Sequence, residues 1–201
     1  MRTGSLPWRA AAVLAALVLL NGSSAAEKSS VDALCRLHGV AAEKSVAQIR
    51  AAYASALSAG IPEDQLYPFM EDILRHRLEC AQMVRVLAVV TELRRENLPY
   101  FVVFSKVREG VVKGAAPALI VDAAESKLKT LFESRDVLIS LGSLGYRVRD
   151  FQNAAVIVSS YIEKGYTPGD VVLRVKQKGI KGAGFAALSV VVERPVKRKE
   201  R

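Results

Sequence analysis

The residue types best suited to chemistry in this chain are two cysteines and two histidines, which occur as two close pairs. The pairs are Cys35-x-x-His38 and His76-x-x-x-Cys80. On a helix, residues three or four positions apart point to the same side. Two such pairs brought together by helix packing would supply a Cys2His2 ligand set for tetrahedral zinc. The long gap between the pairs is not a zinc-finger spacing, so a metal site is one hypothesis among three.

The second hypothesis is a disulfide between Cys35 and Cys80. An oxidising compartment would favour this bond, and the bond would remove the thiolates that a metal needs. The third hypothesis is that the two thiols are not bonded to each other. In that case His38, beside a glycine, is a helix C-terminal cation and His76 belongs to a solvated, charged stretch.

Catalytic patterns are absent from the sequence. No Gly-x-Ser-x-Gly nucleophile elbow occurs. Close acidic pairs such as Glu92 and Glu96 are typical of a solvated helix face. We therefore expect a protein that is not an enzyme and that needs no cofactor.

Two glycine-rich segments also contain lysines and could be taken for phosphate-binding loops. The first is residues 106–120, KVREGVVKGAAPALI, and the second is GIKGAG at 179–184, flanked by Lys176 and Lys178. Neither has the spacing of a P-loop. Lys113-Gly114 fits a helix C-terminus, where a cation meets the negative end of the dipole and glycine adopts a left-handed conformation. The second cluster is interpreted as a break between two helices.

Along the chain, apolar residues recur at helical spacing far more often than they alternate. One stripe runs from Tyr100 to Gly114 in steps of 4, 3, 4 and 3, and a matching stripe runs from Phe151 to Gly165. A looser copy ends at Gly60. Each glycine is followed by a proline that can open the next helix; the joints are Gly60 with Pro62, Gly114 with Pro117, and Gly165 with Pro168.

This register predicts an all-α fold of stacked helical hairpins, with about three units of roughly fifty residues. The units begin near residues 43, 98 and 147. A long helix, either continuous or interrupted, is expected over about 63–97, and 185–192 is either a buried helix or a strand. The charges in 106–120 do not recur, because Lys106, Arg108 and Glu109 stand where the third unit has Ile157, Ser159 and Ser160. Any functional content of this joint is therefore expected in those three charges.

The joint at Glu109-Gly110-Val111-Val112-Lys113-Gly114, followed by Pro117, resembles a pattern of uncharacterised exported helical-repeat proteins of bacteria. The resemblance covers about one unit well and the others loosely. It implies an all-helical protein associated with the cell envelope. It implies no known activity and brings no catalytic residues.

The N-terminus has the three regions of a secretory signal peptide. Arg2 and Arg9 precede an apolar run, and small residues precede Glu27, which predicts cleavage after Ala26. A retained anchor is the alternative that the sequence leaves open. We expect a signal peptide over 1–26, a helical-repeat domain over 27–193 and a basic tail over 194–201. The protein is therefore predicted to be exported, and periplasmic or envelope-associated.

Residues 27–201 contain 27 Lys and Arg against 20 Asp and Glu, and the tail is the most basic segment. Export makes nucleic acid a poor partner for this charge. We expect a non-catalytic module or scaffold that binds an envelope protein or peptide. The alternative is attachment to an anionic membrane or envelope polymer through the tail, whose basic residues are Arg194, Lys197, Arg198, Lys199 and Arg201.

Overall fold

The computed structural model describes residues 31–194, and these residues are mainly helical with two strands of two residues each. The prediction of an all-α fold is confirmed. The expected signal peptide and the tail beyond Arg194 lie outside the described residues.

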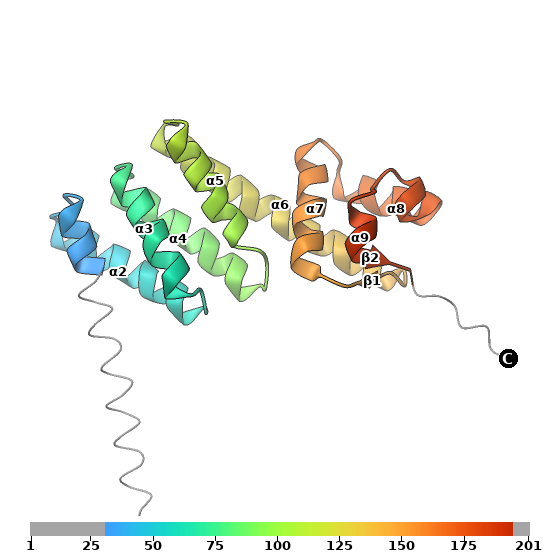
Figure 1. Cartoon of the computed structure of the whole chain (residues 1–201), viewed down its shortest axis with the longest axis horizontal. Helices are drawn as coiled ribbons and strands as arrows, with labels where there is room; N and C mark the ends of the chain where they lie inside the picture. Colours follow the sequence, from blue (N-terminus) through green and yellow to red (C-terminus); the bar gives the residue numbers. More distant parts are fainter. Residues whose placement is uncertain (1–30, 195–201) are drawn as a thin grey trace, which may run out of the picture. The chain divides into compact units, whose positions relative to one another are not determined.

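The elements follow one another with short connections (Figure 1). A helical segment over 31–37 comes first. It is followed by α2 (Glu43–Ser58), α3 (Glu63–Arg75), α4 (Cys80–Arg95), α5 (Phe101–Val112), α6 (Pro117–Ser143), β1 (Arg147–Val148), α7 (Phe151–Glu163), α8 (Pro168–Gly182), α9 (Leu188–Val191) and β2 (Val192–Glu193).

The chain divides into two compact units, residues 1–51 and 52–201. In the first, the segment 31–37 packs through Val31, Leu34 and Cys35, which are all buried. An ion pair also belongs to this unit: Nη2 of Arg50 lies 2.6 Å from Oδ2 of Asp32, and Nε donates to Oδ1 at 2.8 Å.

In the second unit, alternate helices contact one another as well as successive ones. α3 packs on α5, α4 packs on α6, and α6 also contacts α5, α7 and α8 (Figure 1). Phe69 of α3 stacks on Phe104 of α5 with ring centroids 4.1 Å apart, and both side chains are buried. This pattern of contacts is expected of helices that bury one apolar stripe each in a common core.

The joint at Gly114 shows how the helices end. Gly114 has φ +65°, a conformation that residues with a side chain rarely adopt. The N–H of Ala115 donates to the carbonyl of Gly110 at 2.9 Å, and the N–H of Gly114 donates to that of Val111 at 3.1 Å. These two bonds form a Schellman motif. The same pair of bonds ends α2 at Gly60 and α7 at Gly165, while Pro117 and Pro168 open the helices that follow.

The helix expected over 63–97 is divided in two at residues 76–79. Arg77 has φ +54° there, and the N–H of Leu78 reaches back to the carbonyl of Ile73. The break thus uses the hydrogen-bond pattern of the glycine joints without a glycine or a proline. For this reason the helix-breaking residue types gave no signal at this position.

The starts of the helices follow a shorter spacing than the predicted fifty residues. α2, α4 and α6 begin at Glu43, Cys80 and Pro117, each 37 residues after the one before. α6 then continues for 27 residues, whereas α2 and α4 have 16 each. The number of repeat units stays a prediction, but this spacing relates α4 to α2 and α6, which the fifty-residue register did not.

Among the C-terminal elements, β1 and α8 contact α6. β1 and β2 pair antiparallel, with Arg147 opposite Glu193. Gly179, at φ 71° and ψ 165°, kinks α8 near its end. The segment 185–192, which the sequence left open between helix and strand, contains both: α9 ends at Val191 and β2 begins at Val192.

Candidate functional site

The hypothesised disulfide between Cys35 and Cys80 is not present among the described residues. Cys35 is fully buried, whereas Cys80 is the half-buried first residue of α4. Helical spacing alone could not reveal that the two side chains serve different environments.

The histidines do not complete a metal centre with these cysteines. Within residues 31–194, no three His, Cys, Asp or Glu side chains gather so as to hold a metal ion. His76 follows α3, and its Nδ1 lies 2.9 Å from the carbonyl oxygen of Asp72, one turn earlier. His38 likewise follows a helix, and its buried Nε2 has no hydrogen-bond partner among residues 31–194. Both histidines therefore sit at helix C-termini, as the third hypothesis expects of His38.

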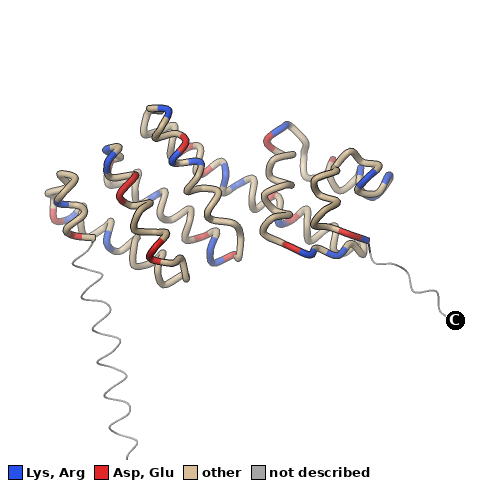
Figure 2. Tube along the Cα trace, viewed as in Figure 1, with Lys and Arg blue, Asp and Glu red and all other residues tan. Residues whose placement is uncertain are grey.

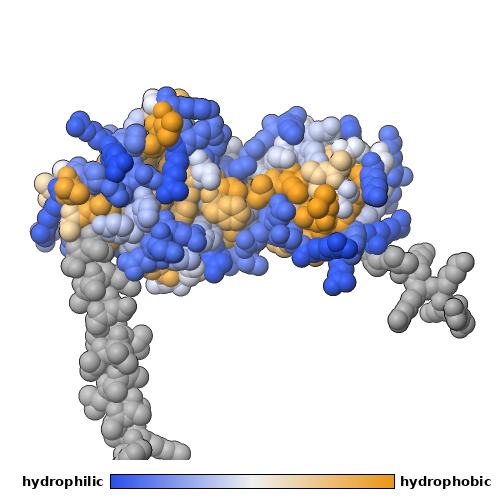
Figure 3. Space-filling model, viewed as in Figure 1, coloured by the Kyte–Doolittle hydropathy of each residue, from blue (hydrophilic) through white to orange (hydrophobic). Residues whose placement is uncertain are grey.

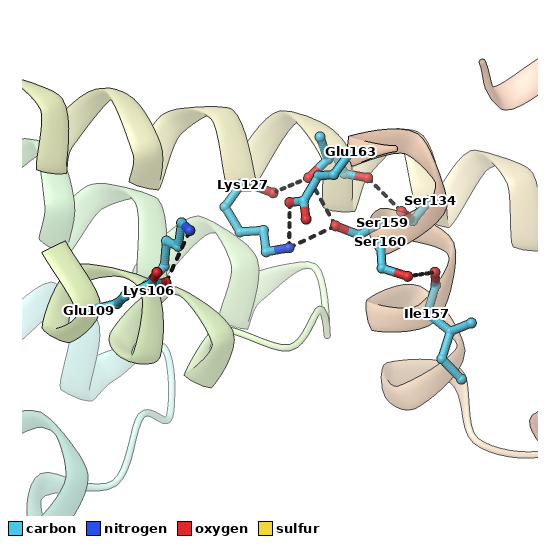
Figure 4. A network of polar contacts seen from close by, with 9 residues as sticks. Lys106, Glu109, Lys127, Ser134, Ile157, Ser159, Ser160 and Glu163 are labelled. Atoms are coloured by element: carbon cyan, nitrogen blue, oxygen red, sulfur yellow. Dashed lines mark hydrogen bonds and ion pairs between the residues drawn. The ribbon is translucent and has the colours of Figure 1, made fainter. Parts of the chain in front are cut away.

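A polar network that the sequence analysis missed lies between α6 and α7 (Figure 4). Nζ of Lys127 donates to Oγ of Ser159 at 3.1 Å and to Oε1 of Glu163 at 2.6 Å. Oγ of Ser159 lies 3.0 Å from Oγ1 of Thr130, which donates to the carbonyl of Lys127. A serine beside a lysine is a known nucleophile–base arrangement in enzymes.

The network does not meet the needs of a nucleophilic serine. Ser159 is 0% exposed, so its hydroxyl has no access to a substrate. A lysine that acts as a base must accept the serine proton, but Nζ of Lys127 donates to both Ser159 and Glu163. The arrangement instead satisfies buried polar groups where two helices meet.

The lysines of the 106–120 joint are engaged with a carboxylate and do not form a phosphate cradle. Lys106 and Lys113 both form ion pairs with Glu109. Their hydrogen bonds hold the pKa of Glu109 below its usual value, and the bond from Lys113 has the larger effect. Arg108 lies 2.6 Å from Asp72 and so links α5 to α3. The three unrepeated charges therefore have partners within the described chain, and a functional role for them stays a prediction.

Apolar surface is exposed beside the same joint. Val112 is 84% exposed and Leu119 is 62% exposed, and Figure 3 shows hydrophobic surface where α5 ends and α6 begins. A small hollow of about 190 Å³ lies there, with Gly110 and Ile120 in its lining.

A larger hollow, of about 420 Å³, opens between the end of α2 and α4. Its lining is mostly small side chains with one acidic and one basic residue: Ala52, Ser55, Val84, Ala88, Thr91, Glu92 and Arg95. Nη2 of Arg95 donates to Oγ of Ser55 at 3.1 Å across it. Such an open, shallow site suits an extended peptide better than a small molecule, because little of a small ligand would be buried.

The positive charge is concentrated at the C-terminal end of the chain. Residues 27–170 contain 18 Lys and Arg and 18 Asp and Glu, whereas residues 171–201 contain nine basic residues and only Glu193 and Glu200 as acidic ones. The whole excess of seven positive charges in 27–201 therefore lies in the last 31 residues. Four of the nine cations, Arg174, Lys176, Lys178 and Lys181, are on α8 (Figure 2).

These cations also differ from the others in their partners. Many basic residues earlier in the chain form ion pairs with carboxylates: Arg50, Arg75, Arg85, Lys106, Arg108, Lys113, Lys127, Lys129, Arg135 and Arg149. None of the ion pairs among the described residues involves Lys176, Lys178, Lys181 or Arg194. We call residues 171–194 the C-terminal basic face.

The sequence analysis assigned the basic surface to the tail alone. The structure extends it into α8, whose lysines lie beyond the last acidic residue of that helix, Asp170. A charge count in windows along the chain could have found this, because no acidic residue occurs between 171 and 192. What the count could not show is that Lys176, Lys178 and Lys181 have no carboxylate partner on any helix that the structure describes.

Comparison of the chain with protein-family models, curated proteins and solved structures found no match. None of the helices in residues 31–194 combines the length and the apolar character needed to cross a membrane.

Proposed function

We propose that the protein is an exported, non-catalytic binding protein that attaches to an anionic surface of the cell envelope through its C-terminal basic face and the tail that follows. The observation that carries this proposal is the confinement of all excess positive charge to residues 171–201, together with the absence of ion pairs between Lys176, Lys178, Lys181 or Arg194 and any carboxylate in residues 31–194. Each Lys or Arg near an anionic membrane contributes on the order of 1 kcal/mol to binding.

The alternative to a lipid surface within this proposal is an anionic envelope polymer, which the same charges would bind. A lipid surface is favoured because apolar side chains accompany the cations. Leu173 of α8 is 52% exposed and Val190 of α9 is 72% exposed. Apolar residues beside lysines add contact with the acyl boundary of a bilayer, whereas a charged polymer has no acyl region for them to contact.

The test is co-sedimentation with phosphatidylcholine vesicles that contain phosphatidylglycerol. We expect binding that weakens as salt rises, since exposed charges are screened beyond about 10 Å at 0.1 M salt. Deletion of residues 195–201, which removes three net charges, should weaken binding strongly. The matched control removes three charges elsewhere, by Lys44→Gln, Lys129→Gln and Lys164→Gln, all exposed positions. Equal losses in the two variants would show that only net charge matters and would refute the proposal.

A second candidate function is protein binding through the hollow between α2 and α4. Its small side chains leave about 420 Å³ open, and the acidic and basic residues on its rim could fix the register of an extended peptide. Ala88→Arg would fill the hollow, whereas Ala81→Arg adds the same side chain to an exposed position of the same helix outside it. Crosslinking in the native envelope should give a partner that the first variant loses and the second keeps. A chain that stays monomeric and without crosslinks would count against this function.

A further inference from the structure

A second hollow of about 420 Å³ lies within the C-terminal basic face. It is lined by residues of α8 and β2 and by Tyr146, which follows the turn after α6. Lys178, Lys181 and Arg194 belong to its lining, with Glu193 as the one acidic residue. The remaining lining residues are Tyr146, Gly179, Ile180, Gly182, Ser189 and Val192. Three cations around one concave site form a different arrangement from cations spread over a convex surface.

The fold builds this hollow from defined local features. Gly179 adopts a left-handed conformation that interrupts α8, so Lys178 and Lys181 flank a bend and not a continuous helix. The hydroxyl of Tyr146 donates to the carbonyl of Val175 at 3.2 Å, which fixes α8 against the end of α6. The β1–β2 pair then positions the start of the tail, and the guanidinium of Arg194 lies over the ring of Tyr146, 5.8 Å from its centroid.

The charge balance of the hollow favours an anion. Glu193 forms an ion pair with Arg149, the residue that follows β1. Nη2 of Arg149 lies 2.5 Å from Oε2 of Glu193. The carboxylate is thus neutralised from outside the hollow, and no other acidic residue is in the lining. The three cations therefore have no counterion among the described residues. Two ammonium groups and one guanidinium from the lining of a single hollow are donors that suit the several oxygens of a phosphate.

We propose that this hollow binds the phosphate of an anionic lipid headgroup, with Lys178, Lys181 and Arg194 as its ligands. The inference rests on the proposed attachment to an anionic surface and makes that attachment specific. In diffuse attachment, every cation of the face contributes alike. With a headgroup site, the lining cations contribute more than equally exposed cations nearby. The two exposed apolar residues of the basic face, Leu173 and Val190, would contact the acyl region beside the headgroup.

The experiment compares two double variants of the full-length chain that remove the same charge. Lys178→Gln with Lys181→Gln changes the lining of the hollow, whereas Lys176→Gln with Lys199→Gln changes one cation of α8 outside the lining and one of the tail. All three α8 lysines are exposed, so both variants should fold, and circular dichroism checks this. The probes are phosphatidylcholine vesicles doped with phosphatidic acid, and vesicles of equal zeta potential doped with oleate, whose charge is a carboxylate.

We expect the lining variant to bind phosphatidic acid vesicles at least about ten-fold more weakly than the control variant, which is the effect of one strong charged contact. On oleate vesicles the two variants should bind alike. Equal losses on phosphatidic acid would overturn the headgroup site and leave the proposed attachment intact. If the unmodified chain bound neither kind of vesicle, the attachment itself would fail and this inference with it.

The lipid as the source of the phosphate is tested separately by titration with glycerol 1-phosphate, followed by calorimetry. We expect weak binding to the soluble headgroup, because it lacks the contacts of the membrane surface. Binding of glycerol 1-phosphate that is lost in the lining variant, without any binding to phosphatidic acid vesicles, would assign the hollow to a soluble phosphate and overturn the lipid source.

Discussion

Lys127 of α6 and Glu163 of α7 form an ion pair whose two members differ in exposure. Nζ lies 2.6 Å from Oε1, but the lysine side chain is 13% exposed whereas the glutamate is 47% exposed. The ammonium is therefore largely removed from water, and the carboxylate is not. Breaking such a pair has a cost that depends on which charge is left behind.

The first prediction follows from this asymmetry. Glu163→Gln leaves Lys127 buried without its counterion and should destabilise the fold by about 1–3 kcal/mol. Lys127→Met leaves Glu163 in water, and Ser159 still has Thr130 as a partner, so the loss should stay below about 1 kcal/mol. Urea unfolding of the two variants measures both values. The reverse order would mean that the lysine is hydrated in solution and that the network contributes little.

The second prediction concerns the joint that ends α5. Gly114 has φ +65° and open space around it, so Gly114→Ala should cost about 1 kcal/mol through backbone strain alone. The control is Gly142→Ala in the last turns of α6, where the glycine also has open space but no positive φ. This second change should stabilise the fold by about 0.4–1 kcal/mol. Thermal unfolding should separate the variants in opposite directions, and equal shifts would contradict the assigned cap.

The third prediction concerns the approach of α5 to α6. A Cβ added at Gly110 would lie 3.0 Å from Cγ1 of Ile120, which is tighter than most real Cβ contacts, so Ile120 would have to shift by a few tenths of an ångström. Gly110→Ala should therefore destabilise the fold by about 1–3 kcal/mol, because the added methyl group overpacks the contact between the helices. This cost should exceed the gain from the higher helix propensity of alanine. The double variant with Ile120→Ala removes the clash and should lose less than the sum of the two single changes. Additive losses in denaturant unfolding would show that the two helices are not in close contact.

The fourth prediction is a pH dependence at the start of α8. Thr167 and Asp170 form a reciprocal capping box. Hydrogen bonds from Thr167 hold the pKa of Asp170 below its usual value; the bond from its side chain has the largest effect, followed by the bond from its backbone. Because the folded pKa is the lower one, this carboxylate stabilises the fold above its unfolded pKa near about 4. The stabilisation is lost as pH falls through the folded pKa.

The measurement is the free energy of unfolding at about pH 6 and about pH 3. Asp170→Asn should show a smaller drop between these values than the unmodified chain, because its side chain does not titrate. Thr167→Val removes the hydroxyl that binds the carboxylate, so it should reduce the drop in the same direction and also cost about 1 kcal/mol at the higher pH as a lost cap. A drop that is the same in all three proteins would exclude Asp170 as its source.

The sequence by itself determined the class of the fold and most helix ends. Apolar stripes at helical spacing, glycines after them and prolines before the next helix are local signals, because each depends on a few neighbouring residues. Gly60, Gly114 and Gly165 all follow helices as expected. The position of the break at Arg77 was not readable because no glycine or proline marks it, and arginine does not favour the left-handed conformation that it adopts there.

Only the tertiary structure decided which polar residues are partners. Lys127 and Glu163, or Arg108 and Asp72, are each 36 residues apart, and no local pattern relates them. For the same reason, the sequence suggested a disulfide between Cys35 and Cys80 that the described part of the chain does not contain. It also could not reveal that the lysines of the 106–120 joint pair with Glu109. Charges become available for a ligand only where folding supplies no carboxylate, and in the described chain the lysines of α8 meet that condition.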